Sequence, residues 1–301
     1  MAKKFSLTQG NYFDRPDDWI SNSMISTYIK SKELYKKMYI DKSVTFKQTA
    51  PMVFGSIVDD KLTQGVTRYE PKLKRTHSKF KRTCKKKDNA EQYDIETAFV
   101  KASDAAYDAE TELIEEQVER VGEDFLVTQE VWDKTEEVVN AIKSAPFWQD
   151  GVENSMMQVP MKGTLQGATV CGMADRIDTL SSDDFRYRMI DLKTVSYLKT
   201  STPQKWFHNC KEFGYFRQLA LYRYLWAELQ GIPLENITCH HAVASWVQDG
   251  LVTIKLFTVP EGILNAAFAE LEMALSGILA GDFEDEKPTW GGAFNFNALS
   301  A

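Results

Sequence analysis

The sequence lacks paired cysteines, a secretory leader and any obvious membrane segment. Its four cysteines form no C-x-x-C pair and have no metal-finger spacing, so we expect reduced, mostly buried thiols at Cys84, Cys171, Cys210 and Cys239. Residues 1–10 contain two lysines but no apolar run of the kind that a secretory signal needs. No apolar run is expected to be long enough to cross a bilayer. These absences predict a cytoplasmic protein without a membrane partner.

An excess of positive charge is also missing. The formal net charge is −7 over 301 residues, which argues against a protein that coats nucleic acid through bulk charge. The exception is the stretch from Lys72 to Lys87, which contains nine Lys or Arg residues and no acid. Such a run is usually a solvated loop, although beside a nucleic-acid site it can contact phosphates. A local nucleic-acid site therefore stays open.

Helical patterns come first in the chain. Apolar spacing predicts helices over about 21–38, 54–62, within 91–124 and over 129–144, where Pro146 stops the last one. Strand patterns follow Gly151, with strands expected over 157–161, 168–180, 186–192, 237–247 and 251–259. The turn Gln248–Gly250 predicts that the last two strands form a hairpin. Helical spacing returns over 203–229 and 263–279.

This order of elements predicts the fold class α/β (α+β), a mixed sheet with inserted helices. We expect one domain over 1–301. Its parts would be a mainly helical segment (1–150), a core (151–260) and a C-terminal helix with an irregular tail (261–301). We find no internal repeat and no low-complexity linker.

Two predicted neighbouring strands carry the residues that matter most. One contains Asp175, and the other contains Asp191 and Lys193. Alternate residues of a strand share a face, so Asp191 and Lys193 project together, and a hairpin can bring Asp175 close to them. An Asp-x-Lys on a strand is often only an exposed pair. Here the flanking residues are apolar, and a buried charge is costly unless it is paired or metal-bound.

Two carboxylates and a lysine suit phosphodiester hydrolysis. Oxygen ligands hold Mg²⁺ or Mn²⁺, and the Leu192 carbonyl could be a further ligand beside Asp175 and Asp191. A lysine at that position can orient or deprotonate the attacking water, or offset charge in the transition state. In the predicted helix that follows, Gln218 and Tyr222 are four residues apart and share a face that could border the site.

These motifs resemble the PD-(D/E)XK nuclease superfamily. Gly-x-x-Asp begins at Gly172, Asp-x-Lys-Thr at Asp191 and Gly-Tyr-x-x-Gln-x-x-x-Tyr at Gly214, in the superfamily's order and at compatible spacing. Within it, the chain is most similar to the RecB-type and exonuclease VIII-like nucleases, many of them phage-encoded. The segments Ser23–Ser26 and Gly55–Asp59 resemble the opening helix and Gly-x-x-x-His motif of that branch, so the resemblance spans about residues 20–260.

The resemblance implies a restriction-endonuclease-like core, a central mixed sheet flanked by helices, with a helical N-terminal part. It implies Asp175 and Asp191 as metal ligands, Lys193 as the catalytic lysine, and Gln218 and Tyr222 beside the site. It also implies a Mg²⁺- or Mn²⁺-dependent exonuclease acting on linear duplex DNA ends, with a single-strand annealing protein as partner. A phage-encoded chain would work in the host cytoplasm, and a ring-shaped homo-oligomer would account for processivity.

The chain departs from the branch at Asp59, where relatives have His. An Asp can also ligate a hard cation, so Asp59 is a candidate ligand, with its neighbour Asp60 as an equal alternative. Within a nuclease we favour DNA contact for the basic run, with binding residues Lys85, Lys86 and Lys87; Arg217 is a further candidate.

Two other functions compete with the exonuclease. A structure-specific endonuclease could use the same core, because channel shape rather than motif separates the two. A non-catalytic DNA-binding scaffold for recombination is the other alternative, although the intact Asp175, Asp191 and Lys193 argue against it. His208, His240 and His241 are interpreted as structural. His240 and His241 are adjacent in a predicted strand and point to opposite faces, so they cannot easily bind one metal ion together. Trp206 and Tyr215 are interpreted as core residues.

Overall fold

The computed structural model describes Tyr12 and residues 18–63, 65, 67–76, 90–150, 152–181, 186–196, 199–246 and 251–285. Of residues 90–104, 152, 181 and 246 it describes the backbone alone. The chain divides into two compact units. The first comprises Met1–Gln48, Asp150–Val243 and Lys255–Ala301, and the second comprises Thr49–Gln149 and Ala244–Ile254.

A mixed β-sheet is the centre of the structure. Its strand order is β1-β5-β6-β7-β8, and β4 also pairs with β5. The strands are β1 (Ile20–Ser21), β4 (Ser155–Leu165), β5 (Ala168–Ser181), β6 (Arg186–Ser196), β7 (Ile237–Trp246) and β8 (Val252–Thr258). β5 is antiparallel to β4 and β6 and parallel to β1. The predicted mixed α/β fold, with helices flanking a central sheet, is confirmed.

The helices of the first unit are shorter than their patterns predicted. The expected helix over 21–38 is α2 (Asn22–Lys30), α3 (Lys32–Tyr35) and the π-helix η1 (Lys36–Ile40). The break falls at Ser31, whose backbone is extended and whose hydroxyl accepts a hydrogen bond from the Leu34 N–H. A side chain that caps a new helix competes with continuation of the old one. The prediction of a single helix over 21–38 is therefore wrong.

A glycine divides the second helical stretch. α8 (Pro203–Phe213) ends and α9 (Tyr215–Gln230) begins at Gly214, which has φ 70° in the left-handed region. Glycine adopts this conformation without steric cost, and it is the usual residue after a helix C-terminus. The turn redirects the chain, so that α9 packs on β4 and β5.

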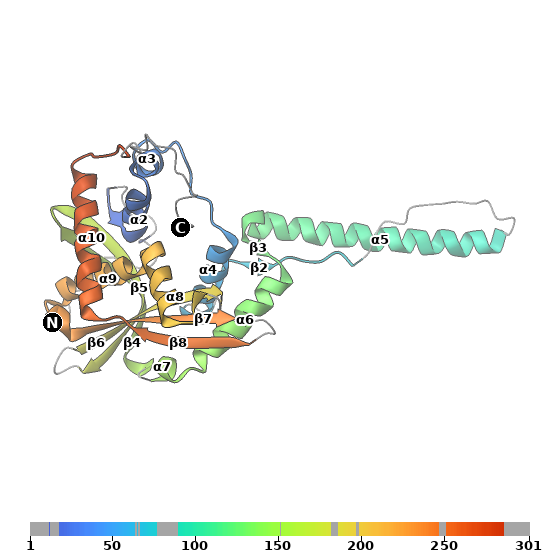
Figure 1. Cartoon of the computed structure of the whole chain (residues 1–301). Helices are drawn as coiled ribbons and strands as arrows, with labels where there is room; N and C mark the ends of the chain where they lie inside the picture. Colours follow the sequence, from blue (N-terminus) through green and yellow to red (C-terminus); the bar gives the residue numbers. More distant parts are fainter. Residues whose placement is uncertain are drawn as a thin grey trace, which may run out of the picture. The chain divides into compact units, whose positions relative to one another are not determined.

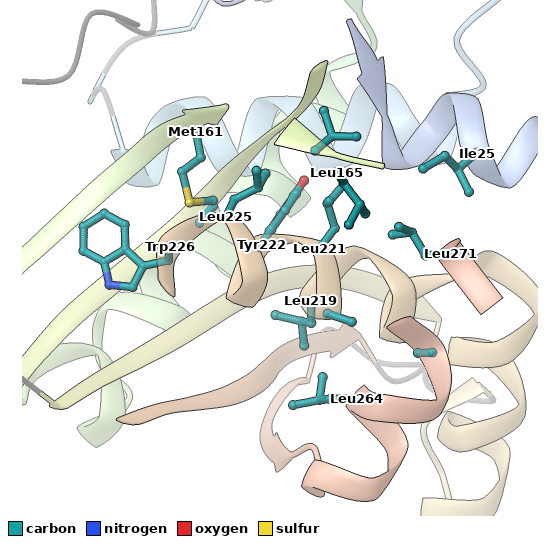
Figure 2. Packing of buried hydrophobic residues seen from close by; sticks show 14 of the residues in the cluster. Ile25, Met161, Leu165, Leu219, Leu221, Tyr222, Leu225, Trp226, Leu264 and Leu271 are labelled. Atoms are coloured by element: carbon teal, nitrogen blue, oxygen red, sulfur yellow. The ribbon is translucent and has the colours of Figure 1, made fainter. Parts of the chain in front are cut away.

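The core of the first unit lies between α9 and the sheet. Figure 2 shows Leu221, Leu225 and Trp226 of α9 projecting toward Met161 and Leu165 of β4. Fully burying such side chains stabilises the fold by roughly 1.5–3 kcal/mol each. The approach is close: a Cβ at Gly163 would lie 2.9 Å from the Leu225 side chain. α9 is thereby held against the strands that carry the acidic motifs.

Helix α10 (Glu261–Leu279) covers the outer side of this core. It packs on α9 and α2, and Figure 1 shows it in red beside α2 in blue. Its length and composition alone would allow it to cross a membrane, so the expectation that no segment is long enough is wrong on that criterion. Leu264, Leu271 and Leu275 are nevertheless buried in the core, as in the core helix of a globular fold.

The second unit contains most of the helical segment predicted for the first half of the chain. Its elements are α4 (Ala50–Thr63), β2 (Glu70–Pro71), α5 (Ala90–Val121), η2 (Glu123–Phe125), β3 (Leu126–Val127), α6 (Gln129–Lys143) and α7 (Pro146–Gln149). α4 begins at Ala50 rather than near Phe54, because a proline is tolerated in the first turn of a helix. Lys61 of α4 lies 3.4 Å from the Trp132 ring centroid and pairs with Glu136, which joins α4 to α6.

Candidate active site

Asp175 and Asp191 lie on adjacent strands, β5 and β6. The pairing of Arg176 with Ile190 continues, one residue further along the antiparallel ladder, to Asp175 opposite Asp191. The Leu192 N–H donates a 2.6 Å hydrogen bond to Asp175 Oδ2. Lys193 Nζ lies 2.5 Å from Asp191 Oδ2, as expected for side chains on one face of a strand. The register thus gathers two carboxylates and one ammonium group.

The charges in this cluster are poorly compensated. The Asp191 side chain is 1% exposed; its Oδ2 is ion-paired and hydrogen-bonded to the Lys193 ammonium group, whereas its Oδ1 has no hydrogen-bond partner among the described residues. Burial lowers the pKa of Lys193, but the Asp191 and Asp175 carboxylates outweigh it and raise that pKa above its ordinary value. Lys193 therefore keeps its proton at neutral pH, and the cluster holds two negative charges and one positive charge.

Helix α9 brings two polar groups to the same cluster. The Gln218 side-chain amide donates a 2.9 Å hydrogen bond to the Tyr222 hydroxyl. Burial, followed by the nearby Tyr12 hydroxyl and the Asp191 carboxylate, raises the pKa of Tyr222 well above its ordinary value. The ring crosses β5 at Gly172, where a Cβ would lie only 2.3 Å from Tyr222 Cε1. Gly172 of the Gly-x-x-Asp motif thus makes room for Tyr222.

Tyr215 also borders the cluster. Lys193 Nζ lies 4.8 Å from the centroid of its ring, a distance at which the cation and the aromatic face attract each other. Tyr215 is the first residue of α9, directly after the Gly214 turn. Helical spacing in the sequence did not predict that Tyr215 lies beside Lys193, because the Gly214 turn sets the direction of its side chain.

His241 of β7 is a second neighbour that was interpreted as merely structural. Its Nε2 lies 3.8 Å from Asp191 Oδ2, and its side chain is fully buried. Burial lowers the pKa of His241 to about 4. In the sequence, His241 stands two residues before Val243 in an apolar strand, which indicates a buried side chain. That position does not reveal that Asp191 of another strand lies beside it.

The other predicted site residues have different surroundings or lie outside the described residues. Arg217 is 8% exposed, and its guanidinium donates to Glu270 at 3.0 Å. Asp59 lies in α4 of the second unit, where its carbonyl accepts from Thr63, and its metal-ligand role stays a prediction. Asp60 accepts from the Thr67 hydroxyl, and burial raises the pKa of its carboxyl group. The run Lys85–Lys87 lies outside the described residues.

The donor set fits a hard divalent cation. Among the residues that the structure describes, no three His, Cys, Asp or Glu side chains form a metal-binding group on their own. Mg²⁺ is commonly held by one or two carboxylates and keeps several waters. The buried Asp191 carboxylate, whose Oδ1 has no hydrogen-bond partner among the described residues, and the neighbouring Asp175 carboxylate match that need. The Leu192 carbonyl follows Asp191 directly in the chain.

The site thus combines a mixed sheet, two aspartates and a lysine on adjacent strands, and a bordering helix that carries Gln218 and Tyr222. The model of the PD-(D/E)XK nuclease superfamily matches residues 20–287. The chain therefore belongs to the PD-(D/E)XK nuclease superfamily.

A solved structure shares the fold. The chain is similar to a protein from Eubacterium rectale named "Putative exonuclease", with 15% identity, a TM-score of 0.57 and 99% of each chain covered. It also matches SSO0001 at 14% identity over 57% of this chain and 68% of that one, but the TM-score is only 0.28. No curated protein matches the chain. At these identities, the Eubacterium rectale structure shows a shared fold.

Proposed function

We propose that the protein is a metal-dependent exonuclease that hydrolyses phosphodiester bonds of linear duplex DNA. The observation that carries this proposal is the convergence of Asp175, Asp191 and Lys193 on one face of β5 and β6. Membership of a nuclease superfamily supports hydrolysis. The choice of DNA ends, the exonuclease type and a role in phage-type recombination beside an annealing protein come from the resemblance of the motifs.

In this proposal Asp175 and Asp191, with the Leu192 carbonyl, hold Mg²⁺ or Mn²⁺. When bound, the cation would neutralise charge on the scissile phosphate and acidify a water. The metal-free cluster carries a net charge of about −1, counting two carboxylates and one ammonium group, which favours a cation. The buried Asp191 Oδ1, which has no donor among the described residues, adds to that preference, because a buried carboxylate oxygen without a donor is costly.

Lys193 donates its N–H groups in this mechanism. As a protonated ammonium group it orients the attacking water and offsets negative charge as the phosphate becomes pentacovalent. At the border of the site the Gln218 amide donates a hydrogen bond to the Tyr222 hydroxyl, and this bond fixes the direction of the hydroxyl group. The deep burial of Asp191 excludes water from its side of the cluster, which strengthens these electrostatic interactions.

The test is digestion of end-labelled linear duplex DNA in Mg²⁺, Mn²⁺ or EDTA, beside covalently closed circular DNA. The exonuclease proposal expects release of nucleotides from the linear duplex with either metal, none in EDTA, and an intact circle. Cleavage of the closed circle would establish the endonuclease instead. Binding to DNA without cleavage in any metal would favour a recombination scaffold and overturn the enzymatic proposal.

A further inference from the structure

His241 contacts the candidate metal-binding residue Asp191 from a strand that carries no nuclease motif. Its Nε2 lies 3.8 Å from Asp191 Oδ2 and has no hydrogen-bond partner among the described residues. Both side chains are at most 1% exposed. A polar nitrogen buried without a partner is uncommon, because leaving it unsatisfied costs about 1–3 kcal/mol.

Aromatic rings fix the orientation of this imidazole. The ring centroids of Trp206, Phe216 and Tyr215 lie 5.5, 5.9 and 6.2 Å from that of His241. On the far side of the ring, His241 Nδ1 lies 3.8 Å from Cys210 Sγ. The imidazole therefore cannot rotate freely, and its two nitrogens face Cys210 and Asp191 respectively.

Three neighbours bear on the position of the ring proton: the Cys210 thiol, the Asp191 carboxylate and the Tyr215 backbone, which hydrogen-bonds to the ring. A neutral imidazole carries one N–H. With the proton on Nδ1, the Nε2 lone pair would face a carboxylate, which repels it. With the proton on Nε2, the Cys210 thiol can donate to Nδ1, and the Nε2–H points at Asp191 Oδ2. The second arrangement provides complementary partners for both nitrogens, and a doubly protonated ring would present the same Nε2–H.

We propose that His241 is a positioning residue, whose Nε2–H, 3.8 Å from Asp191 Oδ2 and not hydrogen-bonded to it, attracts the carboxylate and orients it for binding of the metal ion. The inference rests on the proposed function, since it assigns a role toward the same cation. Partners that orient a metal-binding side chain typically change metal affinity by 10–100-fold when they are removed. The Cys210–His241–Asp191 chain would supply that orientation from behind the carboxylate.

Direct metal binding tests this role without any cleavage assay. Mn²⁺ binding is measured by electron paramagnetic resonance of free Mn²⁺, and Mg²⁺ by competition, for the full-length wild type and its variants. H241L removes the N–H but keeps the bulk, so we expect about 10-fold weaker binding of both metals. H241Q retains an amide N–H and should recover most of the loss.

His240→Leu is the matched control. His240 is the next residue on β7, but it lies on the other face, where its ring nitrogens contact the Thr238 and Thr258 hydroxyls. H240L should bind both metals as the wild type does. Equal affinities for H241L and H240L would overturn the positioning role. A larger loss for Mn²⁺ than for Mg²⁺ in H241L would also overturn it, because that pattern indicates a nitrogen ligand.

A spectroscopic measurement keeps the inference testable if H241L does not fold. Nitrogen-15 NMR of wild-type protein labelled at histidine should show His241 protonated on Nε2, with the resonance changed in D191N. Protonation on Nδ1 alone would overturn the inference. A wild type that binds neither metal would overturn the proposed function itself, whereas normal wild-type binding with an unaffected H241L would overturn only the role of His241.

Discussion

Two clusters of charged side chains lie on β5 and β6, and they differ in how fully their charges are compensated. Around Asp178, Arg176 donates to one carboxylate oxygen at 2.5 Å and Arg188 to the other at 2.7 Å, while the Ser155 hydroxyl donates at 2.6 Å. Both guanidinium groups also donate to the Asp150 carbonyl. Every strong acceptor in this cluster has a donor.

The cluster around Asp191 has the opposite balance. Two carboxylates share one ammonium group, and Asp191 Oδ1 accepts no hydrogen bond within the described residues. Both clusters are buried, and alternation along β5 directs Asp175 and Asp178 to opposite faces. A saturated ion network joins strands, whereas an unsaturated, net negative one is suited to a cation. The difference lies in the number of donors and not in burial.

The largest expected effect is on catalysis. Lys193→Ala removes the ammonium group that the described residues bring to the Asp175–Asp191 cluster, so we expect cleavage of linear duplex to fall by at least about 10²–10³-fold. DNA binding, measured by fluorescence anisotropy in Ca²⁺, should stay close to wild type. Full activity of K193A would show that the Asp191 cluster does not depend on Lys193 for catalysis.

The second prediction separates the two aspartates by stability. D178N leaves Arg176, which is fully buried, without its ionic partner, and we expect unfolding free energy to fall by about 3–5 kcal/mol. D191N should change it by no more than about 1 kcal/mol in EDTA, because Lys193 keeps the Asp175 carboxylate nearby. Urea titrations followed by circular dichroism measure both. Equal losses would show that the two clusters are alike in kind.

The third prediction concerns the close approach behind the site. Gly172→Ala adds a methyl group where the Tyr222 ring already lies within van der Waals distance. The ring must shift, so we expect a loss of about 1–3 kcal/mol of stability and reduced cleavage. Gly167→Ala, in the preceding turn, serves as a contrast, because a Cβ there meets nothing within 4 Å and only its φ of 84° is strained. A G172A variant with wild-type activity would exclude a tight fit at Tyr222.

The smallest effect is expected from the basic run outside both clusters. Neutralising Lys85, Lys86 and Lys87 together should lower the slope of log affinity against log salt by up to about 3, since each phosphate contact contributes roughly 0.9. Cleavage at low salt should change little. An unchanged slope would show that these lysines do not contact DNA. The protein would then bind its substrate through other residues.

The sequence alone determined the five longer strands of the central sheet, the mixed fold class and the residues of the Asp-x-Lys motif, because strand alternation and apolar flanks are local properties. It did not predict the two-residue strands β1, β2 and β3. It also indicated that Gln218 and Tyr222 share one face of a helix. Tertiary structure decided the rest. The turn at Gly214 places Tyr215 over Lys193, and the pairing of β7 in the sheet places His241 behind Asp191. Contacts between residues far apart in the chain depend on register and turn geometry, which no local pattern encodes.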